Sequence, residues 1–285
     1  MLSSDEIRRA VRAALAEDIG SGDVTTLATV PEGTRVSALM VAREPLVAAG
    51  LIVAETALLE LCPHAAIQRI ASDGQRVPAG FELLKIIDSP ARAVLSAERV
   101  ALNFAQRLSG VATLTAQYVD AVSSTGALIL DTRKTTPGLR QLEKYAVVCG
   151  GGTNHRFGLF DAVLIKDNHL AALRGEAPNA IEAAVRRARA RFPELTVEVE
   201  ADTVEQAAQA ARAGADVILL DNMPVETLRA AVRVIRGRAK TEASGGVNLT
   251  TVRAIAETGV DFISVGALTH SARAVDIALD FTLEG

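Results

Sequence analysis

The sequence predicts an α/β protein in which a small mixed α+β region precedes parallel strands joined by helices. From residue 127 onward, short apolar runs alternate with helical patterns, which is typical of parallel strands with crossover helices. Hydrophobic residues make up 49% of the chain, but aromatics only 3% and Trp is absent. The core is therefore built from Ala, Val, Leu and Ile, as is usual where strands are buried on both faces. Strands are expected at residues 128–131, 162–166, 197–201, 217–221, 240–244 and 262–265.

The first third of the chain has a different pattern. Residues 3–17 have the apolar spacing of an amphipathic helix with Ser4 as its N-cap. Residues 35–87 form short apolar runs bounded by Gly and Pro, which indicates strands. A long helix is expected over 91–122, with a break near Ser109-Gly110.

We place the domains from these changes of pattern. Residues 1–110 are expected to form the first domain, with residues 271–285 packing back on it, and residues 111–270 the second. The pattern is compatible with a closed barrel and with an open doubly wound sheet for the second domain. The absence of a GxGxxG motif after a strand disfavours a dinucleotide-binding sheet.

Composition argues against several classes of protein. A net charge of -4 and a pI near 5.7 disfavour a nucleic-acid partner. No apolar run approaches the roughly 18 residues of a membrane span, and the N-terminus lacks the pattern of a signal peptide. Cys62 and Cys149 form no CxxC motif, so we expect a reduced, cytoplasmic protein.

Positive charge nevertheless gathers in one window of this acidic chain. Three of the five lysines and two of the four histidines lie between residues 131 and 169, as a pocket for an anionic small molecule would require. Arg133 and Lys134 directly follow an expected strand, whereas Arg140 and Lys144 are interpreted as helix-surface or interface residues.

The expected strands also end on polar residues. Five of the six stop at Asp131, Lys166, Glu200, Asp221 and Glu242/Ser244. In parallel α/β folds, ligands bind at the carboxyl ends of the strands. A single residue of this kind could be a helix N-cap, but five that carry both signs of charge indicate a site.

Glycines follow the last two strands. Ser244-Gly245-Gly246 and the segment from Gly266 to His270 would let backbone N–H groups approach a phosphate. The cationic set of Arg133, Lys134, His155, Arg156 and Lys166 could hold carboxylates. Glu200 and Asp221 could hold Mg²⁺. Together these groups suggest phosphoribosyl transfer. The competing interpretation is ion pairing between the two charged sets, with ordinary loops between them.

Several motifs make the suggestion specific. They lie at residues 23–26, 96–99, 131–138, 151–156, 165–169, 198–200, 219–222, 242–246 and 264–270. With these motifs the chain resembles the quinolinate phosphoribosyltransferase family over nearly its whole length. The resemblance implies an N-terminal α+β sandwich domain, an incomplete α/β barrel of six parallel strands, and a homodimer with shared active sites, with higher assembly left open.

The resemblance also implies a role for each candidate residue. The reaction would join quinolinate to phosphoribosyl pyrophosphate, with Mg²⁺ as cofactor. Lys134, Glu200 and Asp221 would be catalytic, and Glu200 and Asp221 would also hold the metal. Quinolinate would be bound by Arg99 of the neighbouring subunit and by Arg133, His155, Arg156 and Lys166. Phosphate would be bound by Ser244, Gly245, Gly246, Gly266 and His270.

Two alternatives remain at this stage. One is a phosphoribosyltransferase of the same scaffold that takes a monocarboxylate such as nicotinate. The density of cations favours a dicarboxylate instead. The other is a non-catalytic phosphometabolite-binding protein, which would keep the glycine loops without needing Glu200 and Asp221.

Overall fold

The computed structural model describes residues 2–282 and divides into two compact units. The first comprises residues up to 116, residues 135–151 and residues from 268 onward, and the second comprises residues 117–134 and 152–267. The domain boundary expected at residue 110 falls within helix α4 (Ala91–Val122). Among the described helices, none has both the length and the apolar character that crossing a bilayer requires.

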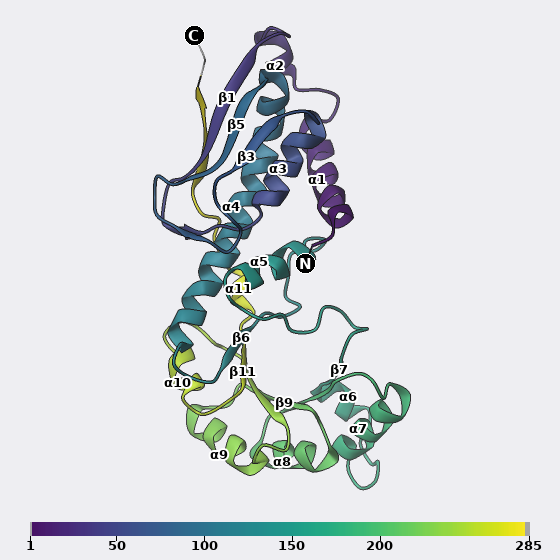
Figure 1. The fold of residues 1–285 in the computed structure, drawn as a ribbon. Helices are drawn as coiled ribbons and strands as arrows, with labels where there is room; N and C mark the ends of the chain where they lie inside the picture. Colours follow the sequence, from purple (N-terminus) through teal and green to yellow (C-terminus); the bar gives the residue numbers. More distant parts are fainter. Residues whose placement is uncertain (1, 283–285) are drawn as a thin grey trace. The chain divides into compact units, whose positions relative to one another are not determined.

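An antiparallel sheet forms one layer of the first unit. Its strands run in the order β12-β1-β5-β3. They are β1 (Arg35–Ala42), β3 (Ala66–Arg69), β5 (Glu82–Pro90) and β12 (Ile277–Thr282). The segment near the C-terminus thus pairs with β1 (Figure 1). A short pair, β2 (Leu46–Val47) and β4 (Arg76–Val77), adds a second sheet.

Helix α3 (Leu51–Leu61) and the first part of α4 pack against this sheet and complete its core. Helix α1 (Ser4–Ile19) packs on α3, and α2 (Val24–Thr29) and α5 (Arg140–Cys149) complete the unit. Alternate residues Val36 and Ala38 of β1 pack with Leu58 of α3 and Val94 of α4. Side chains at i and i+2 of a strand share one face, so this alternation gives the sheet its buried side.

Three local expectations for this unit are wrong. The N-cap of α1 is Ser3, not Ser4, because the Ser3 hydroxyl accepts from the Glu6 N–H and the Glu6 carboxylate accepts from the Ser3 N–H. Helix α4 continues through Gly110, where a Cβ would lie 2.0 Å from the Arg273 carbonyl oxygen. Gly110 therefore permits a close approach of backbone instead of ending the helix. Lys144 is fully buried, as are its neighbours Leu142, Glu143, Ala146 and Val147 in α5, so it is not a surface residue.

Six parallel strands form the sheet of the second unit, as expected. The order is β6-β11-β10-β9-β8-β7. The strands are β6 (Leu128–Leu130), β7 (Val163–Ile165), β8 (Val197–Ala201), β9 (Val217–Asp221), β10 (Lys240–Ser244) and β11 (Phe262–Ser264). The connecting helices are α6 (Asp167–Ala171), α7 (Ala180–Arg191), α8 (Val204–Ala213), α9 (Val225–Ile235) and α10 (Val252–Ala256). Helix α11 (Ala267–His270) follows β11.

The strand order decides between the two candidate architectures. From β7 to β11 each strand lies beside the next one in the sequence, so the direction of winding never reverses. A doubly wound sheet needs such a reversal. Constant winding instead places the crossover helices on one face, as α8 and α9 show (Figure 1). Strands β6 and β7 lie at opposite edges of the described sheet. The incomplete six-stranded barrel is thus confirmed.

Candidate active site

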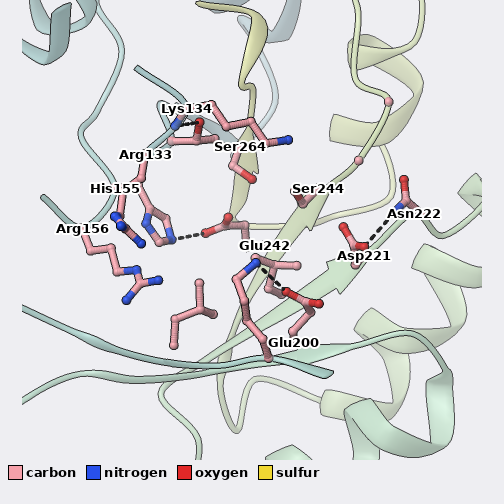
Figure 2. Close-up of a pocket in the computed structure, with 16 residues that line it drawn as sticks. Arg133, Lys134, His155, Arg156, Glu200, Asp221, Asn222, Glu242, Ser244 and Ser264 are labelled. Carbon is pink, nitrogen blue, oxygen red and sulfur yellow. Dashed lines mark hydrogen bonds and ion pairs between the residues drawn. The ribbon is translucent and has the colours of Figure 1, made fainter. Parts of the chain in front are cut away.

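A cavity of about 540 Å³ lies at the carboxyl ends of the parallel strands, entirely within the second unit. Ten of the thirteen predicted site residues line it (Figure 2). They are Arg133, Lys134, His155, Arg156, Lys166, Glu200, Asp221, Ser244, Gly245 and Gly246. The parallel sheet explains this convergence, because all its strands end at the same edge and present the residues that follow them to one space.

Guanidinium and imidazole groups form one side of the cavity. Arg133, His155 and Arg156 lie together in Figure 2. Burial lowers the pKa of Arg156, and the positive charge of Arg133 lowers it further. Two neighbouring guanidinium groups of like charge favour an anion between or beside them. This side of the cavity therefore suits a carboxylated ligand.

Carboxylates form the opposite side. Oxygens of Glu200, Asp202 and Asp221 lie within 4.8 Å of one another. The ammonium of Lys166 lies 3.2 Å from Glu200 Oε2, and Asn222 Nδ2 donates to Asp221 Oδ2 at 2.7 Å. Oxygen donors of this number and type fit Mg²⁺, which takes a few carboxylates and completes its shell with substrate oxygens and water.

The loop after β10 requires glycine at its centre. Gly245 has φ +92°, and a Cβ there would lie 2.1 Å from Asn222 Oδ1. Gly246 has φ +62°, again a conformation that L residues rarely adopt. The loop is fixed by the Asn222 N–H, which donates to the Ser244 carbonyl at 2.9 Å. Its bare backbone faces the cavity, as a phosphate-binding loop requires.

His155 is held by two buried glutamates that were not among the predicted site residues, although Glu242 was noted as a polar residue near a strand end. Its Nε2 lies 2.9 Å from Glu198 Oε2 and 3.4 Å from Glu242 Oε2. Its backbone N–H donates to the buried carboxylate of Asp131 at 2.8 Å. Asp131, predicted as a strand-end residue, thus orients the segment that carries His155.

The missed residues carried a readable signal. Glu198 precedes Glu200 by two positions on β8, and Glu242 precedes Ser244 by two on β10. Side chains two positions apart on a strand share a face. The predicted residues Glu200 and Ser244 therefore indicated that Glu198 and Glu242 lie on the same face of the sheet, further from the strand end. Asp202 and Asn222 each lie one position beyond a strand end, after Ala201 of β8 and Asp221 of β9, and were not among the predicted site residues.

Three predicted residues do not line this cavity. Gly266 lies two positions after the end of β11, and Arg99 and His270 belong to the first unit. Arg99 is exposed on α4, and His270 Nδ1 lies 2.6 Å from the Ser271 hydroxyl. Their assigned roles in acid and phosphate binding stay predictions.

Two family models match the chain. Residues 23–109 match the quinolinate phosphoribosyl transferase N-terminal domain, and residues 111–280 match the C-terminal domain. The chain is 48% identical to the carboxylating nicotinate-nucleotide pyrophosphorylase of Mycobacterium leprae, with 97% of each chain covered. It is 43% identical to the probable carboxylating nicotinate-nucleotide pyrophosphorylase of Bacillus subtilis, over 94% of this chain and 90% of the relative.

Solved structures of nicotinate-nucleotide pyrophosphorylases have the same fold as this chain. NadC from Streptococcus pyogenes has a TM-score of 0.94 at 40% identity, covering 100% of this chain and 99% of that one. The nicotinate-nucleotide pyrophosphorylase from Francisella tularensis has a TM-score of 0.92 at 40% identity, covering 99% and 98%. A human nicotinic acid phosphoribosyltransferase shares the fold, with a TM-score of 0.61 but 12% identity, covering 99% and 74%.

Proposed function

Because the chain belongs to the quinolinate phosphoribosyltransferase family, we propose that it transfers the phosphoribosyl group of phosphoribosyl pyrophosphate to quinolinate in NAD biosynthesis. The products are nicotinate mononucleotide, pyrophosphate and CO₂. The observation that carries this proposal is the division of one cavity into a cationic side, a carboxylate side and a glycine loop. Each part matches one portion of the two substrates.

The cationic side would bind the acid. Quinolinate carries carboxylates on ring positions 2 and 3, and these two anions would lie against Arg133, His155, Arg156 and Lys166. Guanidinium groups make bidentate hydrogen bonds to carboxylates and so fix the plane of the ring. The ring nitrogen would then point toward the ribose C1. Such positioning removes much of the entropic barrier to reaction.

The carboxylate side would act at the ribose. The bond from C1 to the pyrophosphate oxygen breaks, with its electron pair leaving on pyrophosphate, while the bond from the ring nitrogen to C1 forms. The developing positive charge on the ribosyl centre would be stabilised by Glu200 and Asp221. These two residues, with Asp202 beside them, would hold Mg²⁺. The bound ion would neutralise charge on the departing pyrophosphate.

The remaining groups would hold the sugar-phosphate donor. Lys134 would contact its phosphates, and the Ser244–Gly246 loop would receive the 5-phosphate together with Gly266 and His270. No covalent enzyme intermediate is needed, since positioning and electrostatics suffice.

Decarboxylation would follow ribosyl transfer. A cationic pocket stabilises the charged carboxylate in its ground state and so disfavours loss of CO₂ from free quinolinate. Once the ring nitrogen is quaternary, the positive ring accepts the electron pair from the breaking bond to the 2-carboxylate. A proton from solvent then completes position 2 of the ring.

The assembly and location of the enzyme are part of the same proposal. A homodimer would let Arg99 of one subunit reach the quinolinate site of the other. We place the enzyme in the cytoplasm, whereas relatives from Arabidopsis and rice are named chloroplastic.

Product formation from each acid is the decisive experiment. The purified protein is incubated with phosphoribosyl pyrophosphate, Mg²⁺ and either quinolinate or nicotinate, and nicotinate mononucleotide and CO₂ are measured. We expect turnover with quinolinate and none above background with nicotinate, since nicotinate leaves half of the cationic side unpaired. Turnover with nicotinate alone would overturn the assignment, and ligand binding without turnover would indicate a non-catalytic binding protein.

A further inference from the structure

The imidazole of His155 lies between two carboxylates that are almost fully buried. Glu198 is 3% exposed and Glu242 is 1% exposed. One oxygen of each, Oε2, faces His155 Nε2, and the other oxygen of each has no hydrogen-bond partner among the residues that the structure describes. Buried anionic oxygens without partners are costly. Such an arrangement therefore needs a compensating charge.

The sheet fixes this geometry. Glu198 lies on β8 and Glu242 on β10, with β9 between them. The segment carrying His155 is fastened to β6, because the Thr153 N–H donates to Ile129 O and the His155 N–H donates to Asp131. Three strands and one anchored loop thus determine where the ring lies.

An imidazolium accounts for the arrangement better than a neutral ring. Beside a neutral imidazole, which carries one N–H and no charge, two ionised carboxylates would lack compensation, and burial, which raises the pKa of Glu198, would leave that carboxyl protonated. A positive ring between both carboxylates offsets part of their charge. Burial of the ring lowers the pKa of His155, but the hydrogen bonds and charges of Glu198 and Glu242 outweigh it and raise the pKa to about 10.

Most of the other charged groups around the cavity are cations, which disfavour a further positive charge nearby. The cations that line the cavity are Arg133, Lys134, Arg156 and Lys166, from the segment after β6, from the loop of His155 and from the end of β7. The anions are Glu200 and Asp221, which line the cavity at the ends of β8 and β9, and Asp131, which accepts the backbone N–H of His155. The two buried glutamates are therefore what keeps the ring charged in this pocket.

We propose, given the function above, that Glu198 and Glu242 are positioning residues that hold His155 as an oriented imidazolium in the acid-binding side of the cavity. An unperturbed histidine is largely neutral above pH 7. The glutamates keep the ring of His155 protonated, so that both of its nitrogens stay N–H donors, where an ordinary histidine would lose one of these protons. They act on the substrate through His155, although Glu242 also lines the cavity.

Proton NMR of the histidine rings tests this in the ligand-free protein. The chain has four histidines, so a His155→Gln variant identifies the resonance of interest. We expect His155 in the unmodified protein to show no titration between about pH 6 and 8.5. In Glu242→Gln, which keeps the shape but removes one charge, the midpoint should fall by about one pH unit or more, a tenfold change in proton affinity. Glu205→Gln, the same change at an exposed position of α8, should leave it unchanged.

Steady-state kinetics adds a readout that a purely structural defect would not give. If its titration midpoint for His155 lies about one pH unit below 10, Glu242→Gln has about half of its His155 rings neutral at pH 9, so its KM for quinolinate should rise about twofold between pH 7 and 9 relative to the unmodified protein, and more if the midpoint falls further. At pH 6, where both rings are protonated, the two proteins should have similar KM values. If Glu242→Gln fails to fold by circular dichroism, Glu198→Gln replaces it in both measurements.

The outcomes separate this inference from the proposed function. The inference is overturned if the titration midpoint of His155 lies near pH 6.5 in the unmodified protein, or if Glu242→Gln does not change that midpoint. Either result counts even if quinolinate is turned over normally. A raised midpoint that falls in Glu242→Gln, with no turnover of quinolinate, leaves the charge arrangement standing and rejects the proposed reaction.

Discussion

Gly245→Ala should lower the free energy of unfolding more than Gly246→Ala does, although both glycines have positive φ. At position 245 (φ +92°) a Cβ would lie 2.1 Å from Asn222 Oδ1 and 2.5 Å from Asn222 Cγ. At position 246 (φ +62°) no atom outside the neighbouring residues lies within 4 Å of it. The backbone penalty is therefore common to both, and the collision is confined to one.

The magnitudes follow from these contacts. A left-handed conformation costs an L residue about 1–2 kcal/mol, which is the whole expected loss for Gly246→Ala. In Gly245→Ala the Asn222 side chain must also move, which breaks its 2.7 Å hydrogen bond to Asp221. Loss of that bond adds about 0.5–1.5 kcal/mol, and displacement in a packed loop adds about 1 kcal/mol more.

Urea unfolding and the KM for phosphoribosyl pyrophosphate measure the effect. We expect Gly245→Ala to cost about 3–4 kcal/mol and to raise this KM more than Gly246→Ala does. In an Asn222→Ala background, which lacks the colliding atoms, Gly245→Ala should cost only about 1–2 kcal/mol. Equal costs of Gly245→Ala in both backgrounds would refute the collision, and equal KM values for both glycine variants would refute a 5-phosphate at this loop.

Three further predictions concern charge. Lys166→Met should change the free energy of unfolding by less than about 1 kcal/mol, since its ion pair is half-exposed, but lower kcat/KM for quinolinate about tenfold or more; unchanged kinetics would contradict its role. Arg99→Ala protein mixed with Arg133→Ala protein should regain activity through hybrid dimers, and no recovery despite demonstrated subunit exchange would count against shared sites. The hydrogen bond from Arg273 lowers the pKa of Glu44 to about 2, so its stabilisation is complete above pH 4.5 and is lost as pH falls toward 2. Glu44→Gln should flatten that acid dependence by about 1 kcal/mol at most, because the pair is partly exposed, and an unchanged pH profile would contradict the pairing.

The sequence was informative about the acid-binding and donor sides because their chemistry is carried by residue type and position along the chain. Lys166, Glu200 and Asp221 end or directly follow parallel strands, and such ends meet at one edge whatever the details of packing. Their convergence on one cavity was therefore predictable before any contact was known. The tight loop at residues 245 and 246 was predictable for a similar reason, since two consecutive glycines after a strand permit backbone conformations that few other residues tolerate.

Burial was harder to predict than position. Lys144 has the helical spacing of a surface residue, yet it is fully enclosed, because the elements that cover α5 come from distant parts of the chain. Gly110 looked like a helix break, whereas its real constraint is the Arg273 carbonyl more than 160 residues later. Local patterns contain no information about partners at that separation.

The sequence by itself determined the α/β class, the six parallel strands and most of the residues around the cavity, because period, strand ends and motifs are local properties of the chain. The periodic pattern left a closed barrel and a doubly wound sheet both open, and the resemblance implied an incomplete barrel; the strand order of the tertiary structure confirmed that barrel, since strand order depends on long-range pairing. Tertiary structure alone decided that His155 lies between Glu198 and Glu242, which are distant in sequence and adjacent only across β9. The charge of that ring is a property of the fold, because only burial and proximity can set it.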